Sequence, residues 1–157
     1  MGLTPSRNVT HYLVMSNTSA DLHPIHELLA SDLASVDIAE ESVMKRAERV
    51  GFDEDARMDL GLAVREAMVN AVVHGNNYNP KKKVTLSIHT SMDCLRVVIS
   101  DQGSGFEVKS VPDPLSEQNL MKTSGRGLLM MQTYVDELSV KKGANGGTEV
   151  VMVKYLP

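Results

Sequence analysis

The strongest structural signal in the chain is a helical pattern that runs from residue 53 to residue 75. Asp53 stands before it as a candidate N-cap, and Gly75 closes it as a candidate C-cap. Apolar side chains recur between them at spacings of three and four residues: Leu60, Ala63, Val64, Ala67, Met68, Ala71 and Val72. About six turns of helix suit a central element packed along a sheet.

Strand patterns follow this helix. Residues 84–89 alternate apolar and polar side chains, Met92 and Asp93 form a turn, and residues 95–99 form the next predicted strand. Towards the C-terminus, a helix over 127–134 precedes two strands, 137–142 and 148–155, joined by a glycine-rich turn. The pattern predicts an α+β domain.

The first fifty residues carry weaker signals. Residues 11–15 have strand character. Asp21 is a candidate cap for an amphipathic helix, whose predicted apolar stripe is Leu22, Ile25, Leu28, Leu29 and Leu33. Residues 36–50 continue with helical character, interrupted around Asp37 and ended by Gly51, so the pattern leaves one long helix or two open.

Length and composition predict one domain over residues 1–157, with a flexible start over 1–10. A net charge of −4 gives no general attraction for nucleic acid. The start lacks the apolar core of a signal peptide, and no run approaches ~18 apolar residues. We therefore expect a soluble cytoplasmic protein without membrane contact. Cys94 is the only cysteine, which excludes an internal disulfide.

Two polar residues interrupt the apolar stripe of the central helix and form the first of three short polar strings. Glu66 and Asn70 lie four residues apart and share one helix face. Placing them among apolar neighbours is costly unless they have partners. The amide oxygen of Asn70 suits Mg²⁺, and Glu66 would then stand beside bound phosphates as a general base. The alternative is a structural pair that bonds a loop.

A second string, residues 101–106, directly follows the end of a predicted strand. Asp101 can accept a hydrogen bond from the exocyclic amine of adenine, and Gly103 and Gly105 would let the backbone approach the base. Thr148, after Gly146-Gly147, could place a hydroxyl nearby. The alternatives are an ordinary Asp-Gly turn and an exposed strand threonine.

A third string, Gly125-Arg126-Gly127, precedes the helix over 127–134, whose first N–H groups are free to bind phosphate. An ordinary helix start is the alternative. Residues 107–124 contain Pro112 and Pro114 and little periodicity, which predicts a mobile lid beside this string. The three strings together predict an ATP site.

Other site classes find no support in the sequence. There is no Walker-type phosphate loop and no Gly-x-Gly-x-x-Gly run after a first strand. No His-Glu-x-x-His pattern accompanies His74, which we interpret as a packing or supporting residue.

Glu66-x-x-x-Asn70, Asp101-x-Gly103-x-Gly105 and Gly125-x-Gly127, in this order, resemble the motifs of the GHKL (histidine kinase-like) ATPase superfamily. The chain is most similar to the bacterial anti-sigma factor serine/threonine kinases over roughly residues 11–156. The resemblance implies a two-layer α/β sandwich, with a mixed, mostly antiparallel sheet and helices on one face.

The resemblance also implies roles and partners. Glu66 would be the catalytic base, Asn70 the magnesium ligand and Asp101 the adenine contact, with ATP and Mg²⁺ as cofactors. The other implied nucleotide-binding positions are Gly103, Gly105, Gly125, Arg126, Gly127 and Thr148. The implied substrate is an anti-anti-sigma protein, with a sigma factor as an alternative occupant of the same surface. A homodimer stays open.

Two other functions stay open at this stage. One is a histidine-kinase catalytic module, because His26-Glu27-Leu28 imitates the start of a phosphoacceptor box. Against it, only about 40 residues separate His26 from Glu66, too few for a two-helix dimerisation domain. The other is a non-catalytic module that uses ATP, or nothing, to hold a protein partner. The retention of both Glu66 and Asn70 favours catalysis.

Overall fold

The computed structural model describes residues 22–104, 126–144 and 146–157. Its strands form one five-stranded sheet in the order β1-β2-β3-β5-β4, and all four strand pairs are antiparallel. The strands are β1 (Ile25–Ala30), β2 (Lys83–Thr90), β3 (Cys94–Ser100), β4 (Glu137–Lys142) and β5 (Thr148–Tyr155). The expected mostly antiparallel sheet is confirmed, without parallel strand pairs among the described residues.

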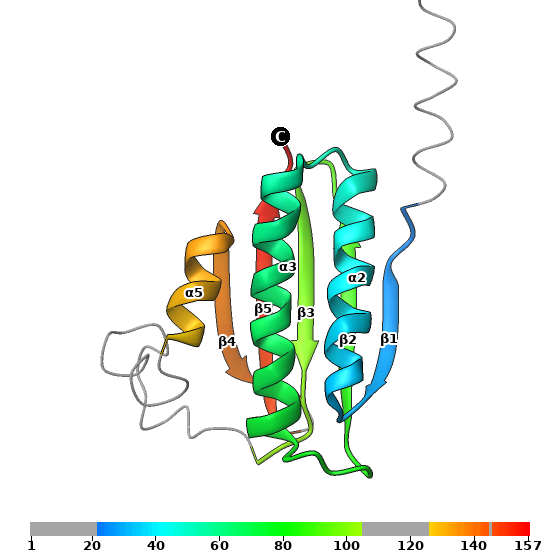
Figure 1. Cartoon of the computed structure of the whole chain (residues 1–157), viewed down its shortest axis with the longest axis vertical. Helices are drawn as coiled ribbons and strands as arrows, with labels where there is room; N and C mark the ends of the chain where they lie inside the picture. The colour runs from blue at the N-terminus through cyan, green and yellow to red at the C-terminus, as the bar shows by residue number, and fades with distance from the viewer. Residues whose placement is uncertain (1–21, 105–125, 145) are drawn as a thin grey trace, which may run out of the picture.

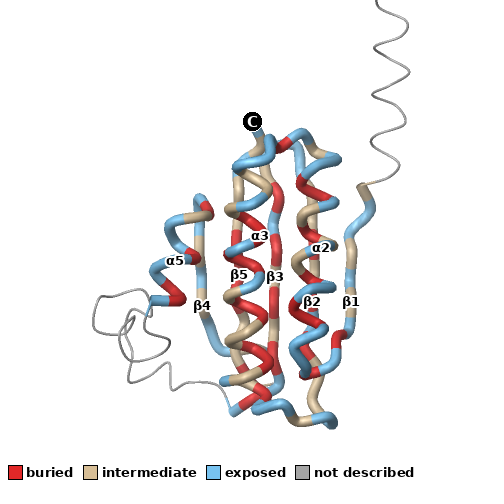
Figure 2. The backbone as a smooth tube through the Cα atoms, in the orientation of Figure 1, coloured by how far each residue is buried: buried red, intermediate tan, exposed pale blue. Residues whose placement is uncertain are grey.

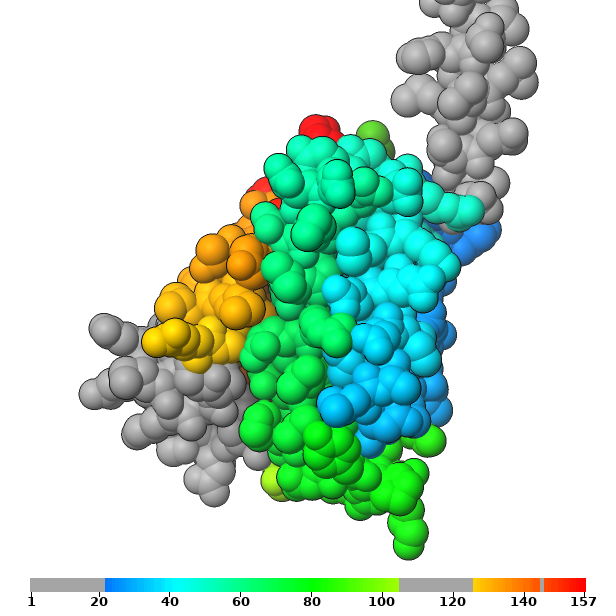
Figure 3. Space-filling view, in the orientation of Figure 1, coloured from blue at the N-terminus to red at the C-terminus, as the bar shows by residue number. Residues whose placement is uncertain are grey.

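Among the described residues, three helices cover one face of this sheet, as Figure 1 shows for their arrangement. They are α2 (Leu33–Arg49), α3 (Glu54–Val69) and α5 (Gly127–Tyr134), and α3 continues into a π-helical turn, η1 (Asn70–Gly75). Figure 3 shows α2 and α3 meeting along their length on this face. The two-layer α+β sandwich predicted from the sequence is therefore confirmed.

The core lies between the two layers, as the buried segments in Figure 2 show. The sheet contributes the alternate residues of its central strands, because successive side chains of a strand point to opposite faces. These include Val84, Leu86 and Ile88 from β2, and Leu95, Val97 and Ile99 from β3. From α3, the predicted stripe is buried, including Leu60, Val64 and Met68.

The predicted helix at Asp21 is wrong. Residues 25–30 form the edge strand β1, which pairs with β2 from Ile25↔Ile88 to Ala30↔Lys83. Leu28 is 67% exposed and its neighbour Leu29 only 8%, so the two leucines face opposite sides of a strand. Two adjacent leucines fit a helical stripe equally well, and only the pairing partner β2 decides between them.

Helix α2 begins at Leu33 because Asp32 caps it by accepting a hydrogen bond from Ser35 N at 2.9 Å. It is one uninterrupted helix past Asp37 to Arg49, which answers the open question of one helix or two. Asp53 caps α3 as predicted, accepting from Ala56 N at 2.8 Å.

The remaining predicted elements agree with the structure at β2, β3, α5, β4 and β5. The predicted strand 11–15 and the predicted lid 107–124 lie outside the described residues. None of the helices among the described residues combines the length and the hydrophobicity that a membrane span requires.

Candidate functional site

Asp101 leaves the end of β3 as a buried carboxylate with 8% of its surface exposed. Its Oδ1 accepts hydrogen bonds from Gly103 N at 2.9 Å and from Thr148 N at 3.1 Å. Its own N–H donates to Thr148 O at 3.0 Å. Its Oδ2 accepts no hydrogen bond from another described residue. Asp101 is therefore held through Oδ1, while Oδ2 has no hydrogen-bond donor among the described residues.

Burial is the main influence on Asp101 and raises the pKa of its carboxyl group above the usual value. The hydrogen bonds from Gly103 and Thr148, together with the positive charge of Lys82, act in the opposite direction but do not cancel the effect. A perturbed carboxyl group in a partly satisfied environment marks a candidate binding position.

Three glycines surround this carboxylate. A Cβ added at Gly75 would overlap the Asp101 carboxylate, and one added at Gly147 would overlap the Asp101 carbonyl oxygen. A Cβ at Gly103 would overlap the carbonyl oxygen of Gly75. The end of η1, the loop after β3 and the turn before β5 therefore meet at Asp101 with no side chain between them.

Gly147 also has a left-handed backbone, with φ of +69°. Glycine adopts this conformation without a steric penalty. The sequence indicated Gly103 through its Asp-x-Gly spacing, but it gave Gly75 only a role in ending a helix and Gly147 only a role in a turn. Their shared contact with Asp101 could not be found from spacing, since it joins three distant segments.

Asn76 is a further buried polar residue next to the place where the three glycines meet Asp101, with 1% of its surface exposed. The sequence patterns described above do not single it out. Its side chain hydrogen-bonds Gln102 N, the residue after Asp101. Asn76 is therefore attached to the same loop that carries the carboxylate.

Glu66 and Asn70 lie at the other predicted part of the site. Glu66 is on α3, and Asn70 is at the junction where α3 becomes η1, with its N–H directed at both Ala67 O and Glu66 O. The π-helical turn is held by bonds such as Asn76 N to Ala71 O at 2.8 Å. Single π-helical turns inside helices are frequent at functional sites.

Both side chains are only partly buried. Neither makes a hydrogen bond or an ion pair with another residue that the structure describes. The structural alternative, a pair bonding a loop, is therefore not what the described residues show. His74, four residues after Asn70, is exposed, so its interpretation as a packing residue is wrong.

Helix α5 packs beside α3 and begins at the buried Gly127. Arg126 precedes it with an exposed side chain and provides no side-chain cap, so the first N–H groups of α5 have no capping oxygen there. Gly105 and Gly125 lie outside the described residues. Thr148 is present at the site through its backbone contacts with Asp101.

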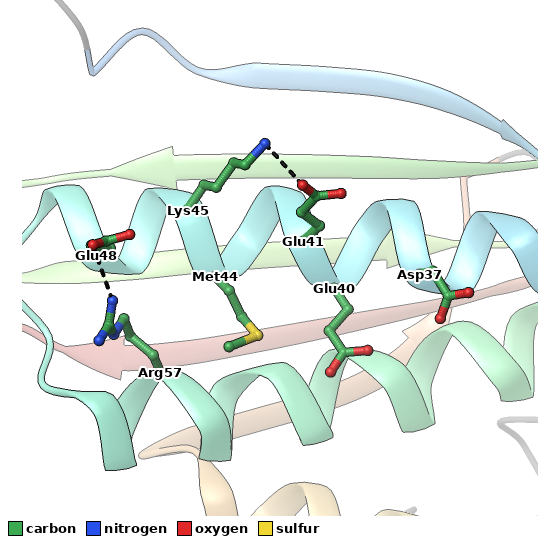
Figure 4. A pocket seen from close by; sticks show the side chains of 7 residues that line it. All are labelled: Asp37, Glu40, Glu41, Met44, Lys45, Glu48 and Arg57. Atoms are coloured by element: carbon green, nitrogen blue, oxygen red, sulfur yellow. Dashed lines mark ion pairs between the residues drawn. The ribbon is translucent and has the colours of Figure 1, made fainter.

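A separate groove of about 330 Å³ lies between α2 and α3 and contains none of the predicted site residues. Figure 4 shows Glu41 next to Lys45 and Glu48 next to Arg57, with Glu40 and Asp37 further along α2. Ion pairs join Lys45 to Glu41 at 3.0 Å and Arg57 to Glu48 at 3.3 Å. Arg65 pairs with the two other acidic residues of the groove, Asp37 and Glu40. The pairs of Arg57 and Arg65 bridge α3 to α2, whereas the Lys45–Glu41 pair lies within α2, and exposed pairs of this kind contribute little each.

Comparison with known proteins shows which family this fold belongs to. A family model described as the histidine kinase-like ATPase domain matches residues 29–154. The chain is 35% identical over 116 residues to a serine-protein kinase RsbW of Bacillus velezensis, covering 70% of this chain and 71% of that protein. It is 32% identical over 100 residues to an anti-sigma F factor of Clostridium perfringens, covering 62% of this chain and 71% of that protein.

Solved structures show the same fold. The RsbU and RsbW domains of Rv1364c from Mycobacterium tuberculosis match with a TM-score of 0.62 at 20% identity, covering 85% of this chain and 32% of that chain. The SiaB-SiaC complex from Pseudomonas aeruginosa matches with a TM-score of 0.59 at 11% identity, covering 94% of this chain and 99% of that chain. The chain belongs to the histidine kinase-like ATPase domain family.

Proposed function

We propose that this chain binds ATP with Mg²⁺ and transfers the γ-phosphoryl group to a serine or threonine of a protein partner. The observation that carries the proposal is the buried carboxylate of Asp101, of which only Oδ1 is hydrogen-bonded by the described residues. A buried polar atom without a partner is costly. The exocyclic amine of adenine would supply the missing donor to Oδ2, beside Gly75, where a side chain would overlap the carboxylate.

Asn70 would hold Mg²⁺ through its amide oxygen, and the ion would supply positive charge beside the phosphates. Arg126 and the first N–H groups of α5 would add positive potential at the same phosphates. The side chains of Asn70 and Arg126 make no hydrogen bond or ion pair with another described residue, which leaves them available for a ligand.

Glu66 is the proposed base. It would take the proton of the attacking hydroxyl, while a bond forms between that oxygen and the γ-phosphorus, the bond from that phosphorus to the bridging oxygen breaks, and ADP leaves. The partly exposed position of Glu66 on the helical face gives a protein partner access to it.

The enzyme class is that of a serine/threonine protein kinase, which curated relatives named serine-protein kinase support at 32–35% identity over 70% of the chain. The proposed substrate is an anti-anti-sigma protein, and the proposed outcome is regulation of a sigma factor. The name of the Clostridium perfringens relative, an anti-sigma F factor, supports this assignment.

The histidine-kinase alternative loses its main support. His26 lies in the edge strand β1, where its Nδ1 is 3.0 Å from Ser87 Oγ. A phosphoacceptor box on a dimerisation helix would need this segment to be helical, and it pairs with β2 instead. The non-catalytic module is the second candidate, and the experiment below separates it from the kinase.

The test begins with recovery of a partner from native cell extract, with and without Mg-ATP. Purified partner is then incubated with γ-labelled ATP and either the wild type or Glu66→Gln. We expect the substitution to lower the transfer rate by ~10²–10⁴-fold, because a general base contributes about that much. Affinity for Mg-ATP should stay near the wild-type value. Asp59→Asn, which removes another partly buried carboxylate on α3, is the matched control.

The outcomes differ clearly. Equal rates for wild type and Glu66→Gln would remove Glu66 from the mechanism. If both the wild type and Glu66→Gln bind ATP tightly but neither transfers phosphate to a confirmed partner, the non-catalytic module would be favoured. A wild type that binds no ATP would refute the nucleotide site itself.

A further inference from the structure

We infer that Asn76 is a positioning residue that sets the distance between Asp101 and Gly75 and thereby the preference for adenine. This inference rests on the proposed nucleotide site and assigns it a residue that does not itself touch the base. Asn76 is 1% exposed, so every polar atom of its side chain must find a partner inside the protein.

The side chain of Asn76 meets three separate segments. Its Oδ1 accepts a hydrogen bond from Gln102 N at 2.8 Å. Its Nδ2 donates to Lys83 O at 3.1 Å and to Ser31 Oγ at 2.9 Å. Because a backbone N–H only donates and a backbone carbonyl only accepts, the orientation of the amide is fixed. No carboxylate or hydroxyl could satisfy all three partners in this way.

These bonds join the two chain segments that pack against each other at the Asp101 carboxylate. Gly75 packs directly against Asp101, and the next residue in each segment, Asn76 and Gln102, is joined by the amide. The side chain of Gln102 strengthens the connection, since its Oε1 accepts from Lys83 N at 2.6 Å. The end of η1 cannot move away from the loop after β3 without breaking these bonds.

A positioning role predicts a selective defect. Adenine donates to Asp101 through its exocyclic amine, whereas guanine presents a carbonyl oxygen at the equivalent position. If the loop shifts, the gain from the amine is lost, but contacts to the phosphates remain. A role in stability alone would lower the affinities for ATP and GTP together.

Ser31 provides the matched control. It accepts one bond from Asn76 and donates to Lys82 O at 2.6 Å, but it has no bond to residues 102–104, the described part of the loop that follows Asp101. Ser31→Ala therefore damages the same buried network on the side away from the carboxylate. Both substitutions should destabilise the protein, and only one should change the choice of base.

The experiment measures the dissociation constants of Mg-ATP and Mg-GTP by calorimetry for the full chain, with thermal unfolding of each variant. We expect Asn76→Ala to lower ATP affinity by about 10-fold, comparable to one hydrogen bond to a charged group, with little change for GTP. Ser31→Ala should keep the ATP/GTP ratio of the wild type. Asn76→Ser, whose hydroxyl is too short to reach Gln102, replaces the alanine variant if that variant does not fold.

An unchanged ATP/GTP ratio in the Asn76 variant, with the wild type preferring ATP, would overturn the positioning role while leaving the nucleotide site intact. If that unchanged ratio comes with an equal loss of affinity for both nucleotides, the role of Asn76 is purely structural. A wild type without affinity or preference for ATP would overturn the proposed function and this inference together.

Discussion

The two ends of the proposed nucleotide site are built in different ways. The adenine end consists of Asp101 and the glycines around it, and its contacts are buried and made largely by the backbone. The phosphate end consists of Glu66, Asn70 and Arg126, whose side chains make no hydrogen bond or ion pair with other described residues. The groups proposed to recognise the base are fixed by the folded chain, whereas the groups proposed for chemistry have no partner among the described residues.

Burial explains the difference. A buried polar group depends on protein partners, as Asp101 does through Oδ1, because water reaches it poorly, whereas a partly exposed group is solvated until a ligand arrives. We therefore expect substitutions at the adenine end to affect folding as well as binding, and substitutions at the phosphate end to affect ligand binding or catalysis alone.

The largest effect on stability is expected for Gly147→Ala. The new methyl group would overlap the Asp101 carbonyl oxygen, and the residue would keep a positive φ. We expect a loss of ~2–5 kcal/mol in the free energy of unfolding, from overpacking plus left-handed strain. Chemical denaturation measures this loss.

Gly51→Ala is the matched control for that substitution. Gly51 also has a positive φ, of +95°, but an added Cβ would meet nothing within 4 Å. It should therefore cost only the backbone term, about 1–2 kcal/mol. Equal losses for the two variants would show that close packing around Asp101 contributes nothing.

The next effect is expected at the phosphate end. Asn70→Ala should lower Mg-ATP affinity by about 100-fold, because the ion loses its proposed protein ligand, while the free energy of unfolding changes little. Calorimetry with Mg²⁺ and with a chelator separates the ion from the nucleotide. Gln132→Ala, which removes an exposed amide from α5, is the control, and unchanged Mg-ATP affinity in Asn70→Ala would refute the magnesium role.

What could be predicted from the sequence depends on whether the deciding contacts are local or distant along the chain. The helix from Asp53 was predictable because its cap and its apolar stripe are local features. The strand β1 was not, because the choice between strand and helix for Leu28 and Leu29 depends on pairing with β2. Tertiary pairing overrides local periodicity in such short apolar runs.

The candidate site follows this rule as well. Glu66, Asn70 and Asp101 are candidates from the sequence alone because each is a polar residue in a recognisable local pattern. Asn76 is not, since its role comes from Ser31, Lys83 and Gln102, which are distant in sequence. The contact of Gly75 and Gly147 with one carboxylate is likewise visible only in three dimensions.

The smallest expected effect concerns the dependence of stability on pH. Burial raises the pKa of Asp101 in the folded state, so in the acidic range the folded protein holds this proton when the unfolded chain has released it. The contribution of Asp101 to stability is therefore greatest below the unfolded pKa, which is about 3.9. It falls as the pH rises through that value towards the raised pKa of the folded state, and is constant above it.

Asp101→Asn removes this titration while keeping an oxygen that can accept from Gly103 N and Thr148 N. The stability of the variant relative to the wild type should therefore increase with pH across that window and then level off, while its ATP affinity is lower than that of the wild type. Urea denaturation at a series of pH values gives the difference, and Gln102→Ala, which leaves the carboxyl group in place, should show no such trend. A difference that does not vary with pH would mean that the carboxyl group is not desolvated, and the contrast between a buried adenine end and a solvated phosphate end would fail at its central residue.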